Sequence, residues 1–325
     1  MGMHEMKKLA TRESYGIALC ELAKERNDFV VLDADLAAAT KTGMFKKEFP
    51  NRFFDCGISE ANMIGVAAGI ATTGMIPFAT SFAMFSTGRA YEQIRNMVGY
   101  PHLNVKIVGT HAGITVGEDG ATHQCLEDIA LMRTIPGMTV ICPSDHYETI
   151  EAVRAAYNHY GPVYIRLGRL SIESFNNSET YRFELGKGVT LSEGNDITII
   201  ATGLMVNESI KAVKMLKEKG VNVRLINIHT IKPIDKEIII KAAMETKVIF
   251  TVEEHNIIGG LGEAVASVVA ENHPIPVHRI GINDQFGHSG PATELLKEYK
   301  LDSIGIVNSI LNILSSATLE TSTQR

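Results

Sequence analysis

Short apolar runs rich in β-branched residues alternate with helix-length stretches along almost the whole chain, and this alternation constrains the fold more than any other feature. Strands that alternate with helices form βαβ units and parallel sheets. The runs are apolar throughout rather than at every second position, as buried parallel strands require. They predict strands at residues 29–32, 53–56, 105–108, 138–142, 163–167, 197–201, 223–226, 248–252 and 277–280.

Stretches of helical length lie between these runs, at residues 12–26, 59–72, 87–99, 145–160, 207–219 and 262–272. The alternation breaks between residues 171 and 196, where Asn, Ser and Gly replace the helical period and one strand is expected near Val189. We interpret this segment as a linker. The predicted fold class is α/β, with two open, mostly parallel-sheet domains at residues 1–175 and 196–325, joined by a linker at 176–195.

The composition is that of an ordinary globular protein and excludes several functions. With 21% charged residues and a net charge of −6, the chain has no basic stripe that would bind nucleic acid. No apolar run reaches the roughly 18–20 residues of a membrane-spanning helix, and the first residues lack the apolar core of a signal peptide. Four cysteines without a CxxC pair argue against a disulfide framework or a zinc site. We therefore expect a reduced, cytoplasmic protein without nucleic-acid or membrane partners.

Titratable residues follow the runs of the first half, at the places where the predicted strands end. In an open parallel sheet, ligands bind beyond the carboxyl ends of the strands, near helix N-termini. The corresponding positions in the second half carry plainer sequences. We therefore predict one site in the first half, drawn from Asp33, Asp35, Glu60, His111, Glu118, Asp119, His123, Arg166 and Arg169.

The segment at residues 110–124 is the most unusual part of this edge. Its glycines at 113, 117 and 120 permit positive φ and a close approach of the backbone to a ligand. A long polar loop inside a globular domain is more often functional than structural. The alternative is a solvated loop whose acids cap the helix that follows.

Glu60 begins a predicted helix, EANMIGVAAGIA, that is apolar on nearly every side. An isolated Glu at a helix start is explained by the helix dipole alone. A carboxylate at the head of an apolar helix is expected to be buried, however. Without a cationic partner, such a carboxyl favours its protonated form near neutral pH. Phe82 and Phe85 follow further along the chain, either as an ordinary core pair or as an aromatic wall for a flat heterocycle.

Long ordered motifs in both halves match one known family. The segments FFDCGISEANMIGVAAGIATTGMIPFATSFAMF, RAYEQIRN and GTHAGITVGEDGATHQCLEDIALMRTIPGMTVICPSD closely resemble the pyrimidine-binding domain of transketolase. HTIKPID and TVEEHNIIGGLGEAV resemble its C-terminal domain, and the resemblance runs from about residue 9 to about residue 311. It implies transfer of a two-carbon ketol unit from a ketose phosphate to an aldose phosphate with thiamine diphosphate, as in the pentose phosphate pathway.

The resemblance also implies roles for individual residues. Glu60 matches the glutamate that binds N1′ of the cofactor's aminopyrimidine and activates it, which makes Glu60 catalytic as well as cofactor-binding. Phe82 and Phe85 match aromatic residues that line the pyrimidine pocket, and Asp35 matches an acid near the cofactor at the subunit interface. Gly88 departs from the family, because many members have a third aromatic residue there.

The sugar phosphate is implied to bind through a second group of residues. His111 matches a catalytic histidine that contacts the sugar, and Asp119 matches the acid that binds the donor's C2 hydroxyl. Arginine suits phosphate because its planar guanidinium donates two parallel hydrogen bonds. The family residues that bind the substrate, chiefly at its phosphate end, are matched here by His123, Arg12 and Arg169. Ala39 or Thr40 stands where a phosphate-contacting Ser can occur, which makes the phosphate contacts a second departure.

The GDG motif that holds the cofactor's diphosphate through a metal in full-length transketolases does not occur in this sequence. The resemblance therefore implies no metal ligand here and a separate N-terminal diphosphate-binding subunit that holds Mg²⁺ or Ca²⁺. It implies an α2β2 assembly, a split enzyme with a homodimer of this chain at its centre. In the second half, we read GGLGE at residues 259–263 as a tight helix start rather than a phosphate site, and His255 as structural.

Three alternatives remain open at this point. The corresponding half of deoxyxylulose-phosphate synthase and the β subunit of a 2-oxoacid dehydrogenase share the Glu60 motif. The loop with His111, Asp119 and His123 favours transketolase over both, because a hydroxylated sugar needs several polar partners. A non-catalytic scaffold subunit is the third, and the intact set of polar residues argues against it. A simple nucleotide-binding module is disfavoured, since neither G-x-G-x-x-G nor a P-loop is present.

Overall fold

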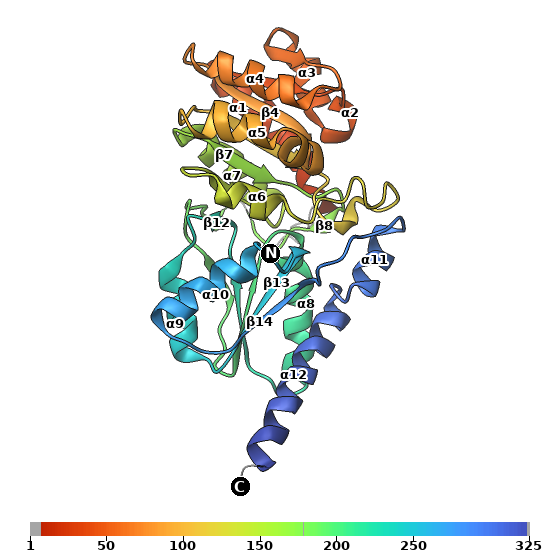
Figure 1. Cartoon of the computed structure of the whole chain (residues 1–325), viewed down its shortest axis with the longest axis vertical. Helices are drawn as coiled ribbons and strands as arrows, with labels where there is room; N and C mark the ends of the chain where they lie inside the picture. The colour runs from red at the N-terminus through yellow and green to blue at the C-terminus, as the bar shows by residue number, and fades with distance from the viewer. Residues whose placement is uncertain (1–7, 178, 324–325) are drawn as a thin grey trace.

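The computed structural model describes residues 8–177 and 179–323, and within them two large sheets that lie one above the other in Figure 1. The first sheet has the strand order β12-β6-β7-β5-β4-β2-β3. Its strands are parallel except β12, which pairs antiparallel with β6. They are β2 (Phe29–Asp33), β3 (Phe53–Asp55), β4 (Ile76–Phe82), β5 (Lys106–Thr110), β6 (Thr139–Ile141), β7 (Val163–Arg166) and β12 (Thr230–Lys232).

Helices cover both faces of the first sheet. One face packs against α1 (Thr11–Glu25), α3 (Thr42–Glu48) and α7 (His146–Asn158). The other packs against α4 (Glu60–Ala71), α6 (Asp128–Thr134) and two π-helical turns, η2 (Met84–Arg89) and η3 (Ile94–Gly99), on either side of α5 (Tyr91–Gln93). Smaller elements are α2 (Ala37–Thr40), the 3₁₀ turns η1 (Pro50–Arg52) and η4 (Ile114–Val116), and a pair formed by β1 (Lys8–Leu9) and β8 (Ile172–Glu173).

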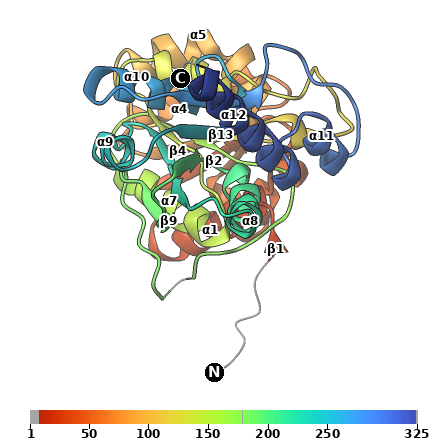
Figure 2. The ribbon, with the colours of Figure 1, turned by 90° about the horizontal axis from the view of Figure 1, so that it is seen from below.

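The second sheet has the order β14-β13-β10-β11-β9, parallel except for β9 at one edge. Figure 2 shows α9 and α10 on one side of it and α8 and α11 on the other, and α12 extends away from the sheet in Figure 1. The strands are β9 (Val189–Ser192), β10 (Ile197–Ala201), β11 (Val223–Asn227), β13 (Ile249–Asn256) and β14 (Val277–Ile282). The helices are α8 (Leu204–Glu218), α9 (Lys236–Glu245), α10 (Leu261–Asn272), α11 (Ala292–Glu298) and α12 (Ser303–Thr323).

One hydrophobic core joins the two sheets. Buried residues of α4, α6 and the first sheet belong to the same cluster as residues of α9, α10 and the second sheet. Strand β12 comes from the second half of the sequence but extends the first sheet, with Thr230 opposite Ile141. The two halves are therefore packed as one body, and β12 crosses the division that we predicted.

The predicted fold class is confirmed, and every predicted strand has a counterpart in the structure. The central strand β4 was missed, because Pro77 near its start argues against a central strand and Thr80 and Ser81 interrupt its apolar pattern. The helix expected at 87–99 is wrong in type, since this segment consists of η2, α5 and η3. Within the described residues, no helix has the length and apolar character needed to cross a membrane.

Candidate functional site

Four aromatic side chains from three segments meet at the carboxyl end of the first sheet. Phe82 is the last residue of β4, Phe85 lies in η2, and His111 follows β5 directly. The Phe82 and Phe85 rings stack with centroids 5.9 Å apart, and Phe82 stacks on His111 at 3.8 Å. His123 completes the group, with its ring edge-on to Phe85 at 5.2 Å. Residues that are up to 41 positions apart in sequence (82 to 123) therefore form one wall.

His111 is held in one tautomer by its neighbours. Arg12 can only donate, so its Nη1, 2.9 Å from His111 Nε2, makes that ring nitrogen an acceptor. Nδ1 then carries the proton and donates to Thr110 Oγ1 at 2.9 Å. Burial, followed by the charge of Arg12, lowers the pKa of His111 to about 3. The ring is therefore neutral at physiological pH and fixed in position.

Glu60 is buried as predicted, at the first position of α4, with 2% of its side chain exposed. The condition considered in the sequence analysis, burial without a cationic partner, does not hold here. Arg89 in η2 donates from Nη1 to Glu60 Oε2 at 2.9 Å. The sequence gives no sign of this pair, because 29 positions separate the residues and the π-helical turn that brings them together was not predicted.

The guanidinium of Arg89 also lies over the ring of Phe85, with Cζ 4.6 Å from the ring centroid. The carboxylate of Glu60 and the face of Phe85 therefore hold a flat N–H donor between them. This arrangement fits the aminopyrimidine of thiamine diphosphate, which is also flat and donates an N–H when its ring nitrogen is protonated. Glu60 would hold the ring nitrogen and Phe85 would stack on the ring.

A cavity of about 780 Å³ opens beside Phe85 and Arg89. Gly88 lines it, and a Cβ at this position would lie 2.2 Å from Met84 Cε. Where many family members have an aromatic side chain, the end of the Met84 side chain therefore lies against Gly88. Two acidic residues, Glu127 and Asp284, also line this cavity. Asp284 belongs to the loop that follows β14.

The remaining predicted site residues do not all lie next to the aromatic group. Arg12 donates to the carbonyl oxygen of Ala39 as well as to His111, and Arg169 donates to Val116 O and pairs with Glu118 at 3.1 Å. Asp119 is exposed on the loop at 110–124. Asp35 is exposed and has a φ of 60°, and His111 has a φ of 56°. Both are non-glycine residues in the left-handed region, which is unusual and common at functional sites.

The second half of the chain holds the loop at 110–124 in place, which the sequence analysis did not foresee. Glu254 at the end of β13 accepts a hydrogen bond from the backbone N–H of Thr115 at 2.7 Å. A Cβ on Gly113 would lie only 2.2 Å from Glu254 Oε1. At the other end of the loop, Gln124 Nε2 donates to His288 O at 2.9 Å. Gly113 therefore permits the close approach of a carboxylate of this chain rather than only of a ligand.

A buried ion pair supports the same junction. Arg166 donates from Nε to Asp128 Oδ2 at 2.8 Å and from Nη2 to the carbonyl oxygen of Glu254 at 2.8 Å. Tyr164 donates to the same Asp128 oxygen at 2.7 Å. The sequence analysis listed Arg166 among the candidate residues at the strand ends; the structure gives it a role in holding the two halves together.

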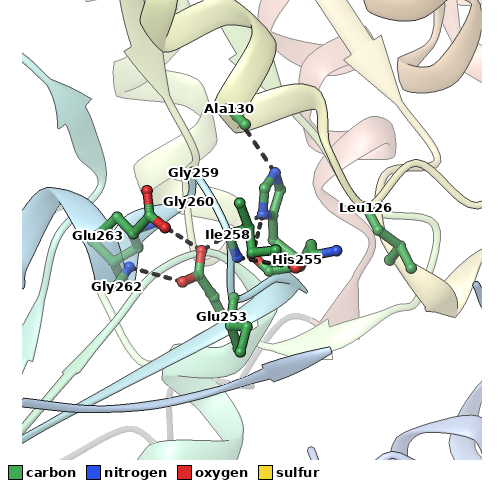
Figure 3. A network of polar contacts seen from close by, with 12 residues as sticks. Leu126, Ala130, Glu253, His255, Ile258, Gly259, Gly260, Gly262 and Glu263 are labelled. Carbon is green, nitrogen blue, oxygen red and sulfur yellow. Dashed lines mark hydrogen bonds and ion pairs between the residues drawn. The ribbon is translucent and has the colours of Figure 1, made fainter. Parts of the chain in front are cut away.

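The segment GGLGE forms a tight helix start, as expected (Figure 3). The carboxylate of Glu253 accepts the backbone N–H groups of Leu261 and Gly262 at 2.6 and 2.7 Å, so the chain itself satisfies the N-terminus of α10. His255 is buried, with Nε2 accepting from Ala130 N at 3.4 Å and Nδ1 donating to Asn256 O. His255 thus has the structural role that the sequence suggested.

Comparison with known proteins defines the class of this chain. Residues 7–173 match the family model "Transketolase, pyrimidine binding domain", and residues 186–306 match "Transketolase, C-terminal domain". The chain belongs to the transketolase family, whose members depend on thiamine diphosphate.

Individual relatives narrow this class. The chain is 55% identical over 302 residues to the "Putative transketolase C-terminal section" of Methanocaldococcus jannaschii, covering 92% of this chain and 95% of that protein. It is 45% identical to the "6-deoxy-6-sulfo-D-fructose transketolase subunit SqwH" of Clostridium sp., covering 88% of each. A solved structure described as "Split gene transketolase, inactive beta4 tetramer" superposes with a TM-score of 0.88 at 48% identity, covering 94% of this chain and 99% of that one. The chain is thus similar to the C-terminal subunits of split transketolases.

Proposed function

We propose that this chain is the C-terminal subunit of a split transketolase, which transfers a two-carbon ketol unit from a ketose phosphate to an aldose phosphate. The observation that carries the proposal is the meeting of Glu60, Phe85, Phe82, His111 and His123 at one edge of the first sheet. Thiamine diphosphate, when bound, supplies the carbon nucleophile and the electron sink for breaking a C–C bond.

This chain's own residues would position the reactants. Glu60 would hold a proton at the pyrimidine ring nitrogen, and Phe82 and Phe85 would fix the plane of that ring. His111, neutral and oriented by Arg12, presents an uncharged imidazole to the sugar. Polar groups that suit a hydroxylated, phosphorylated substrate come from the loop at 110–124 and from α1 and the segment after β7, namely Asp119, His123, Arg12 and Arg169.

We further propose that a separate diphosphate-binding subunit completes the site and holds Mg²⁺ or Ca²⁺, in an α2β2 assembly with a homodimer of this chain at its centre. Apolar side chains remain exposed on β3, on α4 and η3 and on the segment just before Glu60: Phe54, Val66, Met97 and Ile58. Ile58 alone is 78% exposed, two residues before the buried carboxylate. Single exposed apolar residues are ordinary, but a group that adjoins a functional site indicates a binding surface. We propose that the diphosphate-binding subunit covers it.

Other parts of the proposal rest on coarser observations. We propose the division into residues 1–175, 176–195 and 196–325; the match of the pyrimidine-binding model to residues 7–173 supports the first boundary. We also propose a cytoplasmic protein of the pentose phosphate pathway; its four cysteines are all free, as is usual in a reducing compartment.

The test is reconstitution of activity. The wild-type chain would be mixed with a GDG-bearing diphosphate-domain subunit, thiamine diphosphate and Mg²⁺, and two-carbon transfer from xylulose 5-phosphate to ribose 5-phosphate would be followed. We expect activity in the mixture and in neither chain alone. Cofactor binding without transfer would instead favour the synthase or the dehydrogenase, and an absence of cofactor binding would favour a scaffold subunit.

Glu60→Gln tests the assigned chemistry within that mixture. Gln retains the shape of Glu60 but does not share a proton with the ring nitrogen, so activity should fall by at least two orders of magnitude, as for loss of general acid–base catalysis. Glu271→Gln, an exposed carboxyl at the end of α10, is the matched control and should be fully active. Turnover of Glu60→Gln equal to that of the control would refute the role of Glu60.

A further inference from the structure

Arg89 occupies an unusual position for a surface arginine. Its side chain is 53% exposed, yet it pairs with Glu60, which is only 2% exposed. The same guanidinium lies 4.6 Å from the centroid of the Phe85 ring. A buried carboxylate without a partner is costly, and Arg89 removes that cost in the isolated chain.

The contacts of this guanidinium are those that a pyrimidine ring would need. Both groups are flat, both stack on an aromatic face, and both donate an N–H to a carboxylate. Glu60 Oε2 accepts from Arg89 at 2.9 Å, so this oxygen is already engaged. A second flat donor that stacks on Phe85 and bonds to Glu60 therefore competes with Arg89 for the same place.

We propose that Arg89 is a built-in placeholder for the cofactor's pyrimidine ring, which satisfies Glu60 before the cofactor binds and must move aside when it does. The inference rests on the proposed function, and it adds a residue that regulates loading of that site. Arg89 is a positioning residue in this account, because it acts through Glu60.

The structure contains room for the displaced side chain. Arg89 lines the cavity of about 780 Å³, and its neighbour Gly88 contributes no side chain to that space. Two acidic residues, Glu127 and Asp284, line the same cavity, and their charge would attract a guanidinium that has left Glu60. Arg89 is half exposed, so its side chain borders solvent as well as the cavity.

Competition of this kind lowers the apparent affinity for the cofactor. The binding-competent fraction of the subunit is the fraction in which Arg89 has released Glu60, and the apparent dissociation constant rises in inverse proportion to it. We expect the ion pair between half-exposed Arg89 and buried Glu60 to be formed, and the pyrimidine site therefore closed, in most molecules of the subunit. Removing the guanidinium should therefore tighten cofactor binding about five- to tenfold.

The experiment compares Arg89→Met with wild type in the complex with the diphosphate-binding subunit. Met keeps an unbranched apolar chain against Phe85 but has no N–H donor. Isothermal titration calorimetry with thiamine diphosphate at fixed Mg²⁺ gives the dissociation constant without reference to activity. Arg95→Met is the matched control, since Arg95 is exposed six residues further on and its side chain bonds to Asn96. The complex with this variant should bind thiamine diphosphate with the wild-type affinity.

The outcomes separate the two proposals. A wild-type complex that binds no thiamine diphosphate refutes the proposed function, and this inference with it. A wild-type complex that binds the cofactor while Arg89→Met binds it equally or more weakly refutes the placeholder alone. If Arg89→Met does not fold, Arg89→Lys serves instead, because Lys keeps the positive charge but lacks the planar guanidinium. We expect the Arg89→Lys complex to bind thiamine diphosphate at least twofold more tightly than wild type. Unchanged binding overturns the inference.

Discussion

Gly113→Ala should destabilise the loop at 110–124 through a clash with the second half of the chain. Gly113 has φ 81° and ψ −172°, a region that is essentially restricted to glycine and costs other residues about 1–3 kcal/mol. The new Cβ would also lie 2.2 Å from Glu254 Oε1 and displace that carboxylate from the N–H of Thr115. Leaving a buried donor without its acceptor costs about 1–3 kcal/mol. The expected loss in free energy of unfolding is the sum, about 2–6 kcal/mol.

A double-mutant cycle in urea separates these two contributions. In a Glu254→Ala background the clash is gone, so Gly113→Ala should cost only the backbone strain, about 1–3 kcal/mol. Gly117→Ala is the matched control: Gly117 also has positive φ, at 85°, but its nearest non-neighbouring atom is Gly290 O at 3.3 Å. It should cost the same with and without Glu254. If Gly113→Ala lowers the free energy of unfolding equally in both backgrounds, the proposed clash with Glu254 is refuted.

Three further predictions follow from buried groups. Arg166→Met should lower the free energy of unfolding by about 3–5 kcal/mol, because Asp128 stays buried without its cation; a loss below about 1 kcal/mol in urea would contradict this. Burial raises the pKa of Glu148 to about 7, so the folded state keeps this proton longer than the unfolded chain, and this group's contribution to stability falls as pH rises from about 4.5 to 7. Glu148→Gln should gain stability relative to wild type across that window and stay constant above it in urea titrations; a flat difference would contradict the shift. The His111 ring should show no titration between pH 5 and 8 by NMR, since its pKa lies near 3; a midpoint near 6.5 would show that the ring is solvated.

The sequence predicted the sheets because buried parallel strands leave a direct signature. Val163–Arg166 and Ile197–Ala201 are apolar at every position or nearly so, and each is buried throughout. Strand β4 lacks that signature, although it lies at the centre of the first sheet between β2 and β5. Its neighbours, rather than its own residues, decide its conformation.

The positions of the site residues followed from topology, since the carboxyl ends of parallel strands meet at one edge. That rule brought Glu60 and His111 to the same edge, as expected. The contacts made by these site residues could not be predicted from the topology of the sheet. The pairing of Glu60 with Arg89 depends on a π-helical turn, and the support of Thr115 by Glu254 joins residues 139 positions apart.

The amino-acid sequence by itself therefore determined the fold class and the family, and it predicted the edge at which the candidate site residues meet, because hydrophobic periodicity and long motifs are properties of local sequence. Only the tertiary structure decided which charges are paired. A hydrogen bond or ion pair forms only when side chains from different elements are placed to within a few tenths of an ångström, and sequence spacing does not encode such placement. Glu60 illustrates both parts: its burial at the head of an apolar helix was readable, and its cationic partner was not.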